Sequence, residues 1–490
     1  MTASHAFGPL HRVRPGRPRK LFLLAAGLLI LLGALVRAAF LDYPLRYDEA
    51  WHYYYSSAKS LSYIATHFNH VLHSLLVRCT IQLFGTSPTA LRLPAFAAGV
   101  FLIPLTGWLA WQLSQRRVVV LLSMLAAAGS SQLVEYSVNA RGYSWLAVFA
   151  TLATICTVYL IRNPSRGFLW LLWGIVGAMG AYAHAIMLLP MVGLGGAIVM
   201  AALLPPRGSA ERMHLIRGLI VGSAVCGLIT CALFIPILTT TGELSGNLGE
   251  FEKCKRVYRE YLDAHGAMFA ATWHVWVRHS NVFWKLALGV GLVSFVVAAA
   301  RSPARQNLVP LIILVALPVA LWLVGMPVVP PGWVFALPLL LVCSMTGICL
   351  QSERIRFDGK KVFGRVIPAV VAVAAVMNVV NVSRQSYLST WDHELVDVEE
   401  IVAELNAYGT RRCALVSRYN PATRYYIHQL GVSKPLATDD PAVRRAYIVV
   451  GTLDTLEGLW NEDVAGFSLY GPAVEHRRFA RSALYVAERG

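Results

Sequence analysis

The sequence predicts a polytopic α-helical membrane protein with a small soluble α/β domain at its C-terminal end. Of the 490 residues, 56% are hydrophobic and only 14% are charged, which is too apolar for a soluble multidomain protein. Apolar runs long enough to cross a bilayer recur as far as residue 382. From about residue 390 the apolar runs become short and alternate with polar segments, as in packed helices and strands.

The apolar runs predict about eleven membrane spans, at about 20 residues per span. In order, the runs cover residues 20–40, 91–113, 118–134, 143–161, 168–186, 187–204, 216–238, 282–300, 308–326, 333–350 and 364–382. The first run follows a basic segment at 11–20 and shows no small-x-small cleavage site before Asp42. We therefore expect it to be a retained span rather than a signal peptide.

The basic residues between the runs predict the orientation in the membrane. Short connections on the side of the basic N-terminus carry Arg116, Arg117, Arg162, Arg166, Arg301 and Arg305. By the positive-inside rule this side is cytoplasmic, so the net charge of +17 indicates topology rather than a nucleic-acid partner. We expect a multi-pass protein of a bacterial inner membrane, with the segment after residue 383 on the periplasmic side.

The predicted outer loop at 240–281 is the exception to this charge pattern, because it carries Lys253, Lys255, Arg256 and Arg259. A longer folded loop can break the positive-inside rule. A basic cluster there can bind an anionic lipid headgroup, or it can be the solvated face of a helix. Both interpretations stay open.

The first outer loop, residues 41–90, and the C-terminal part are predicted to be structured. The loop carries helix-like apolar spacing in pieces too short to span, which is typical of interfacial helices. The C-terminal part shows a helix at 399–408, a strand at 413–416, a helix at 421–430 and strands at 447–450 and 483–486. We therefore divide the chain into a membrane domain, 1–382, and a soluble domain, 383–490, to which we assign no catalysis because it lacks a phosphate loop and metal spacing.

The most unusual stretch is the run from Arg46 to Tyr55, in which Asp48 and Glu49 stand among aromatic residues. A membrane anchor needs the Trp and Tyr rings but not the two carboxylates, so the stretch indicates the active site of a membrane enzyme. An alternative role for Asp48 is the N-cap of an interfacial helix. Neighbouring residues of a helix point about 100° apart, so the two acids are expected to have different roles.

The cysteines and acidic residues give little indication of a metal. Five of the eight cysteines fall within apolar runs, where cysteine acts as a small hydrophobe, and no Cys-x-x-Cys occurs. Cys79, Cys254 and Cys413 are predicted outside the lipid, and a disulfide between two of them stays open. An Asp-Glu pair without Asp-x-Asp is a weak metal signal, so we assign no metal ligand and leave a divalent cation open.

Four motifs occur in the order and spacing found in one group of membrane enzymes. They are residues 48–50 (Asp-Glu-Ala), 69–76 (Asn-His-Val-Leu-His-Ser-Leu-Leu), 83–87 running into 91–94, and 136–143 (Tyr-Ser-Val-Asn-Ala-Arg-Gly-Tyr). In these motifs the first 200 residues or so resemble the polytopic GT-C glycosyltransferases, which include protein O-mannosyltransferases and the aminoarabinose transferases of lipid A. The later spans match this group only in number and hydropathy.

The resemblance implies a GT-C-like helical bundle and a sugar transferase. Such an enzyme takes a sugar from a polyprenyl-phosphate carrier on the outer face and transfers it to an acceptor hydroxyl of a lipid, glycan or protein. By this resemblance Asp48 matches the general base that acts on the acceptor. Arg141 matches the arginine that faces the carrier phosphate.

The chemistry of this transfer points to further candidate residues. A glycosyl phosphate already holds a leaving group, so the protein has to accept the hydroxyl proton and stabilise the charge on the departing phosphate. We expect Glu49 to orient Arg46, Arg141 or an acceptor group. The other candidates are Arg92, Arg46 and His70 for the donor phosphate, and Tyr53, Asn69, His73, Tyr143 and His184 for the substrates.

Each of these candidates also has an ordinary structural interpretation. Arginines at span ends, such as Arg141 and Arg92, commonly anchor a helix at the headgroups. His184 can be a satisfied polar residue of the bundle. His70 and His73, three residues apart, are expected on one helix face, but zinc would need a third ligand that the sequence does not identify.

The sequence departs from the family pattern at two places. Where the aminoarabinose transferases have a lysine followed by two prolines, this chain has Asn69, His70 and Val71, so His70 or Asn69 would have to bind the phosphate. Where many members open a late span with an arginine-tyrosine pair, residues 330–333 read Pro-Pro-Gly-Trp. These departures leave the donor and the acceptor open.

Two other classes of function compete with a transferase. A transporter or flippase of a lipid-linked sugar usually shows internal repeats or paired broken helices, and the two halves of this chain show no self-similarity. A scaffold with a C-terminal sensing domain would not explain the acidic loop.

Overall fold

The computed structural model describes residues 18–66, 70–205, 208–240, 265–302, 304–323, 328, 330–354, 363–385, 398–407, 413–416, 425–428, 445–451, 472–478 and 482–488. The chain divides into two compact units. The helical unit contains Met1–Leu41, Leu61–Leu83 and Arg92–Leu388, and the C-terminal unit contains Asp42–Ser60, Phe84–Leu91 and Ser389–Gly490. Two parts of the first loop thus group with the C-terminal segment: Asp42–Ser60, which carries the acidic motif, and Phe84–Leu91.

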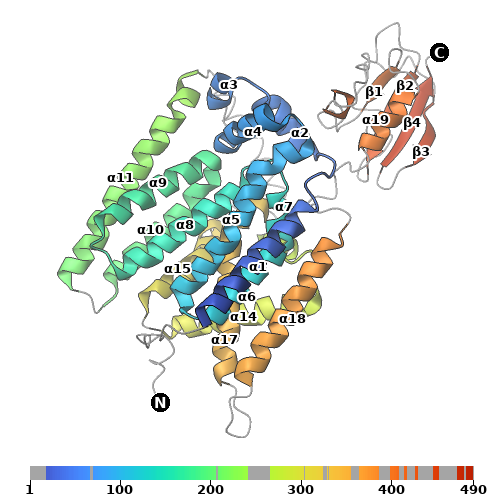
Figure 1. Cartoon of the computed structure of the whole chain (residues 1–490). Helices are drawn as coiled ribbons and strands as arrows, with labels where there is room; N and C mark the ends of the chain where they lie inside the picture. Colours follow the sequence, from blue (N-terminus) through green and yellow to red (C-terminus); the bar gives the residue numbers. More distant parts are fainter. Residues whose placement is uncertain are drawn as a thin grey trace. The chain divides into compact units, whose positions relative to one another are not determined.

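The predicted spans all coincide with helices, and the chain is a multi-pass helical membrane protein (Figure 1). Within the described ranges, nine helices are long and apolar enough to cross a membrane, and a bent pair makes a tenth. The remaining predicted span, α9 (Gly167–Ala183), is apolar but has only 17 residues. The other bounds are α1 Pro18–Ala38, α5 Pro88–Ser114, α8 Tyr143–Arg162, α10 Leu188–Leu203, α11 Ser209–Thr240, α13 His265–Trp276, α14 Val282–Ala300, α15 Leu308–Leu311, α16 Leu317–Leu323, α17 Leu337–Arg354 and α18 Phe363–Ser383.

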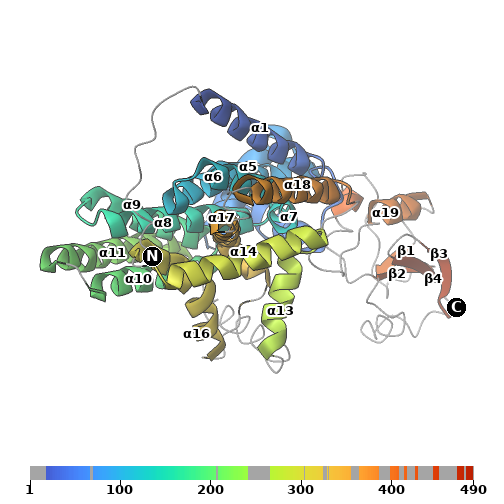
Figure 2. The same cartoon turned by 90° about the horizontal axis from the view of Figure 1, so that it is seen from below.

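Helix α17 forms the centre of the helical unit. Its span is buried throughout, and it packs against α6, α8, α14 and α18 (Figure 2). The contact with α14 is made backbone to backbone, since a Cβ atom on Gly347 would lie 1.9 Å from the carbonyl oxygen of Gly291. Small residues at such contacts let membrane helices approach closely. This packing holds the helices together, because lipid supplies no hydrophobic force between them.

The run at 118–134, predicted as one continuous span, is broken in the structure. Helix α6 (Arg117–Gly129) and helix α7 (Ser131–Ser137) meet at an angle of 59°, with Ser130 extended between them. The break frees carbonyl groups at the end of α6. Ala127 and Ala128 accept hydrogen bonds from Arg37, and Gly129 accepts one from Asn378. Backbone irregularity within a membrane requires such internal partners, which the apolar pattern alone does not reveal.

The first loop contains short helices, as the sequence predicts. They are α2 (Tyr47–His52), the π-helical turn η2 (Tyr53–Ser57), α3 (Leu61–Thr66) and α4 (Val71–Phe84). In the helical unit, α3 and α4 pack on α9 and α11 through a cluster of Ile64, Val71, Tyr182 and Ile237. Of the predicted loop 240–281, residues 241–264, with their four basic residues and Cys254, lie outside the described residues.

The C-terminal unit contains helix α19 (Val398–Ala407) and a four-stranded sheet of order β1-β2-β4-β3 (Figure 1). Strands β1 (Cys413–Val416) and β2 (Arg445–Gly451) are parallel, while β4 (Ser482–Glu488) is antiparallel to β2 and to β3 (Val474–Arg478). The predicted helix 399–408 and the predicted strands coincide with these elements. Strand β3 was not predicted, because its five residues are exposed and carry no apolar alternation. Of the predicted helix 421–430, residues 425–428 are described and helical.

Candidate active site

The acidic motif lies on the short helix α2 of the C-terminal unit. Its N-cap is Arg46, whose backbone N–H donates to Glu49 Oε2 over 3.0 Å. Glu49 is fully buried and makes the reciprocal half of a capping box. The capping acid is therefore Glu49, whereas Asp48 is the second residue of the helix and is only half-buried.

The electrostatics around Asp48 are visible in its neighbour Tyr47. Burial raises the pKa of the Tyr47 hydroxyl, and the negative charge of Asp48 raises it further. The helix thus separates the two acids into a buried cap and a more accessible carboxylate.

Two tyrosines of the C-terminal segment contact the parts of the first loop in the same unit. The backbone N–H of Leu45, one residue before the N-cap, donates to the hydroxyl of Tyr426 over 2.9 Å. The hydroxyl of Tyr425 donates to the carbonyl of Thr86, and its ring lies 5.7 Å from the ring of Tyr53. The sequence alone does not distinguish Tyr425 and Tyr426, because a tyrosine pair in a soluble segment has no characteristic spacing.

A second group of candidate residues forms a ring cluster in the helical unit, composed of His70, Tyr136, Tyr143 and His184. The ring centroids of His70 and His184 are 4.7 Å apart, and that of Tyr143 lies 5.4 Å from His70 and 5.1 Å from His184. Tyr136 extends the cluster, with its centroid 4.6 Å from that of Tyr143. The structure thus brings together three candidate residues, His70, Tyr143 and His184, that lie more than 40 residues apart in the sequence.

Arg141 lies beside this cluster, with its guanidinium carbon 5.1 Å from the centroid of Tyr143. The arginine belongs to the turn between α7 and α8, where its backbone N–H donates to the carbonyl of Asn139 over 2.7 Å. Stacking on an aromatic face orients a guanidinium without using its N–H donors. The arrangement therefore places an oriented positive charge beside the cluster.

Gly142 makes the cluster sterically possible. A Cβ atom at this position would lie 2.6 Å from the carbonyl oxygen of Ala183 and 2.9 Å from Nδ1 of His70. Only a residue without a side chain allows the α7–α8 turn to approach both groups. The glycine of the fourth motif is thus explained by close packing of three chain segments.

His184 is held in a neutral state. Burial, and after it the positive charge of Arg141, lower the pKa of His184 to about 3. Its Nδ1 accepts a hydrogen bond from the backbone N–H of Ile186 over 3.2 Å. A neutral imidazole that accepts at Nδ1 carries its proton at Nε2, so His184 can donate a hydrogen bond from that atom.

The expectation that His70 and His73 share a helix face is wrong. His70 precedes α4 and has a left-handed backbone with φ of 49°, while His73 lies within the helix and is fully buried. The positive φ turns the His70 ring toward Tyr143 and His184 rather than along α4. The spacing predicts a shared face only if the helix is continuous from residue 69 onward. Asn69 itself lies outside the described residues.

Arg92 has a partner of its own in the structure. It is buried at 1% exposure, and its guanidinium donates to the carbonyl of Leu41 over 3.0 Å and to that of Phe40 over 3.4 Å. These contacts fix the chain just after α1. The phosphate roles of Arg92 and Arg46 and the substrate-binding roles of Tyr53 and His73 stay predictions. Among the described residues, no group of three or more His, Cys, Asp or Glu side chains is placed to hold a metal ion.

Comparisons with known proteins give structural likeness only. No protein-family model and no curated protein matches the sequence. The structure is similar to ArnT from Cupriavidus metallidurans bound to undecaprenyl phosphate, with a TM-score of 0.57 and 12% identity over 96% of this chain and 98% of ArnT.

It is also similar to the oligosaccharyltransferase AglB from Archaeoglobus fulgidus, solved with an inhibitory peptide and a dolichol phosphate. The TM-score is 0.56, with 11% identity over 95% of this chain and 74% of AglB. A second structure of that enzyme, with Zn and sulfate, gives a TM-score of 0.58 and 12% identity over 94% of this chain and 72% of the enzyme. The expectation from the sequence motifs is thus confirmed at the level of architecture: the chain has the GT-C fold that these membrane transferases share.

Proposed function

We propose that the protein transfers a sugar from a polyprenyl-phosphate-linked donor to an acceptor hydroxyl on the outer face of the membrane. The observation that carries this proposal is the ring cluster with Arg141 beside it, in a fold whose solved examples include complexes with undecaprenyl phosphate and dolichol phosphate. Those complexes support a lipid-linked donor for this chain.

In this proposal the donor phosphate is bound by Arg141 and the histidines of the ring cluster. The guanidinium offers paired donors that match two phosphate oxygens. His184 adds a neutral N–H donor, which stabilises an anion without competing for its proton. His70 takes the place of the lysine that the related aminoarabinose transferases have in the second motif, and Arg92 and Arg46 are the further candidates.

The proton of the acceptor is taken by Asp48. The acceptor oxygen forms a bond with the anomeric carbon, and the bond between that carbon and the phosphate oxygen breaks. The hydroxyl proton passes to Asp48, and the carrier leaves as a polyprenyl monophosphate. Glu49 holds α2 through the backbone N–H of Arg46, so it acts on the orientation of Asp48 rather than on the proton.

The test is transfer by the purified full chain in lipid vesicles, with a polyprenyl-phosphate sugar and candidate acceptors supplied. Release of the polyprenyl phosphate and formation of a glycosylated acceptor are measured. We expect Asp48→Asn to lose about 10²–10⁴-fold in turnover, the usual contribution of a general base, with unchanged expression and fold.

Asp42→Asn is the matched control, because Asp42 is an exposed carboxylate of the same loop. Near-normal turnover of Asp48→Asn would contradict the base assignment. Movement of the lipid-linked sugar across the vesicle membrane without its consumption would instead support the alternative, a flippase.

A further inference from the structure

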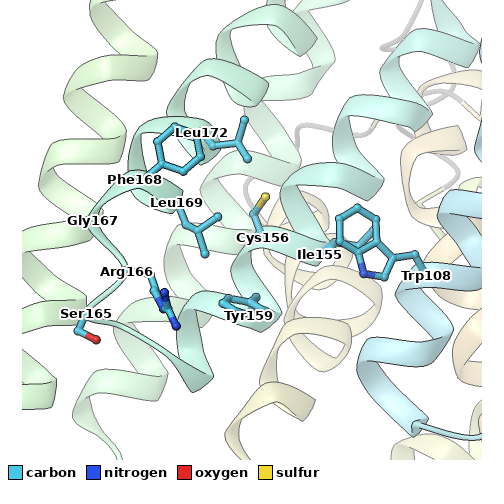
Figure 3. Close-up of a pocket in the computed structure, with 10 residues that line it drawn as sticks. All are labelled: Trp108, Ile155, Cys156, Tyr159, Ser165, Arg166, Gly167, Phe168, Leu169 and Leu172. Carbon is cyan, nitrogen blue, oxygen red and sulfur yellow. The ribbon is translucent and has the colours of Figure 1, made fainter. Parts of the chain in front are cut away.

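The helical unit contains a pocket that none of the proposed catalytic residues line. It has a volume of about 560 Å³ and lies between α5, α8 and α9. Its walls are mainly apolar and include Trp108, Ile155, Cys156, Tyr159, Leu169 and Leu172 (Figure 3). Ser165 and Arg166, from the connection between α8 and α9, complete the lining.

The charge of this pocket has one sign. Arg166 is exposed and forms the N-cap of α9, whose first turn contains no acidic residue. All of the lining residues are neutral except Arg166, and Figure 3 shows its guanidinium beside Tyr159, on the side of the pocket away from Phe168 and Leu172. An anion is favoured at this end, because the positive charge and the N-terminal end of a 17-residue helix act in the same direction.

The opposite side of the pocket suits a hydrocarbon chain. Phe168 is 72% exposed and Trp108 is 49% exposed, and both belong to helices of a membrane protein, where exposed apolar side chains face lipid. Arg166 and Tyr159, at one end, are of the residue types that membrane proteins place at headgroup level. Apolar walls below such residues are complementary to an acyl chain.

We propose that this pocket binds an anionic phospholipid, with its phosphate at Arg166 and one acyl chain along Ile155, Leu169 and Leu172. By the positive-inside rule the connection at 163–166 faces the cytoplasm, so the lipid comes from the leaflet richer in anionic headgroups. This site is independent of the proposed sugar transfer, since none of its residues takes part in it.

The test is native mass spectrometry of the full chain after extraction from vesicles of equal phosphatidylglycerol and phosphatidylcholine. We expect the wild-type protein to retain one phosphatidylglycerol preferentially. Arg166→Ala should lower this preference about fivefold, the effect of one basic residue at a membrane surface, and Arg166→Lys should retain most of it. Cys156→Trp, which fills the pocket, should reduce retention of both lipids.

Arg301→Ala is the control, because Arg301 is another exposed arginine that ends a helix, α14, outside the pocket. Equal retention of the two lipids by the wild-type protein would overturn the proposal. An equal loss in Arg301→Ala and Arg166→Ala would also overturn it, because the attraction would then be diffuse rather than local.

A second inference rests on the proposed function and on a different observation, the contacts of Tyr425 and Tyr426. The Tyr426 hydroxyl accepts from Leu45, the residue that precedes the N-cap of α2, and Tyr425 contacts both Thr86 and Tyr53. Both tyrosines are buried, at 1% and 5% exposure. We infer that Tyr426 is a positioning residue that fixes the start of α2 and thereby the carboxylate of Asp48.

The test compares Tyr426→Phe with Tyr485→Phe as the control. In the wild-type protein the Tyr485 hydroxyl donates to Glu475 Oε2 over 3.1 Å elsewhere in the same unit. We expect Tyr426→Phe to speed amide exchange at residues 45–50 and to lower kcat up to about tenfold, with the donor KM unchanged. Unchanged exchange at these amides would overturn the inference. If Tyr426→Phe speeds the exchange but the wild-type protein has no transferase activity, the positioning role of Tyr426 stands and the proposed function is refuted.

Discussion

Arg37 Nε donates a hydrogen bond to Ser137 Oγ over 3.0 Å, joining α1 to the bent pair α6–α7 across 100 residues of sequence. The arginine is fully buried, and its other donors contact the carbonyls of Gly33, Ala127 and Ala128 at 3.0 to 3.2 Å. A charged residue within a membrane helix is costly unless it is paired in this way. The guanidinium therefore donates hydrogen bonds to the carbonyl groups that lack a helical partner at the break after α6.

We expect Arg37→Leu to destabilise the helical unit by about 2–4 kcal/mol, because two or more buried carbonyls lose their partners. The measurement is thermal unfolding of the purified protein in detergent. Lys20→Leu is the control, since Lys20 is an exposed cation near the other end of the same helix. Equal midpoints for the two variants would show that the contacts of Arg37 add nothing to stability.

Glu49 is expected to act through the helix rather than through the chemistry. Glu49→Ala removes the acceptor of the Arg46 N–H and should destabilise α2 by about 1 kcal/mol, with a loss of turnover. Glu49→Gln keeps an acceptor oxygen and should retain most of the activity. The two variants are compared by steady-state transfer and by amide exchange of α2. A loss in Glu49→Gln as large as that in Asp48→Asn would assign Glu49 a direct role in proton transfer.

Arg141 is expected to determine the affinity for the donor. Arg141→Ala should raise the donor KM by about ten- to a hundredfold, the effect of losing a charge-assisted pair of hydrogen bonds, with a smaller effect on the acceptor KM. Arg141→Lys keeps the charge but not the paired donors, so an intermediate value is expected. Lys59→Ala removes an exposed cation of the first loop and serves as the control. An unchanged donor KM in Arg141→Ala would make Arg141 a membrane anchor.

Gly142→Ala is expected to disrupt the ring cluster, because the added methyl group would lie 2.6 Å from the carbonyl oxygen of Ala183. The carbonyl belongs to the backbone and cannot move as a side chain does, so the turn carrying Arg141 has to shift. Turnover should fall more than tenfold, since small displacements of positioned groups are costly for catalysis. Gly196→Ala is the control, because no atom lies within 4 Å of its added Cβ. Equal activity of the two variants would contradict this packing argument.

The fold could be predicted from the sequence because the dominant signal, apolar runs of span length, depends on composition rather than on contacts. What the sequence could not reveal depends on three-dimensional partners. The break at Ser130 lies within a run of span length, yet its carbonyl groups depend on donors that Arg37 and Asn378 supply from distant helices. Likewise, the left-handed conformation of His70 is not visible in its spacing from His73, although it decides which rings His70 contacts.

His184 is expected to reduce stability in acid. In the folded protein the pKa of His184 is lowered to about 3, first by burial and then by Arg141, whereas an unfolded histidine titrates near 6.5. Between these values the unfolded chain binds the proton and the folded protein does not, so stability present above about pH 6.5 is lost as the pH falls toward 3. His184→Gln should therefore flatten the fall of Tm between pH 6.5 and about 4, whereas His214→Gln, at an exposed position, should leave it unchanged. An identical Tm profile for wild type and His184→Gln would mean that folding leaves the pKa of His184 unshifted, and it would contradict the effect of burial and Arg141 on this side chain.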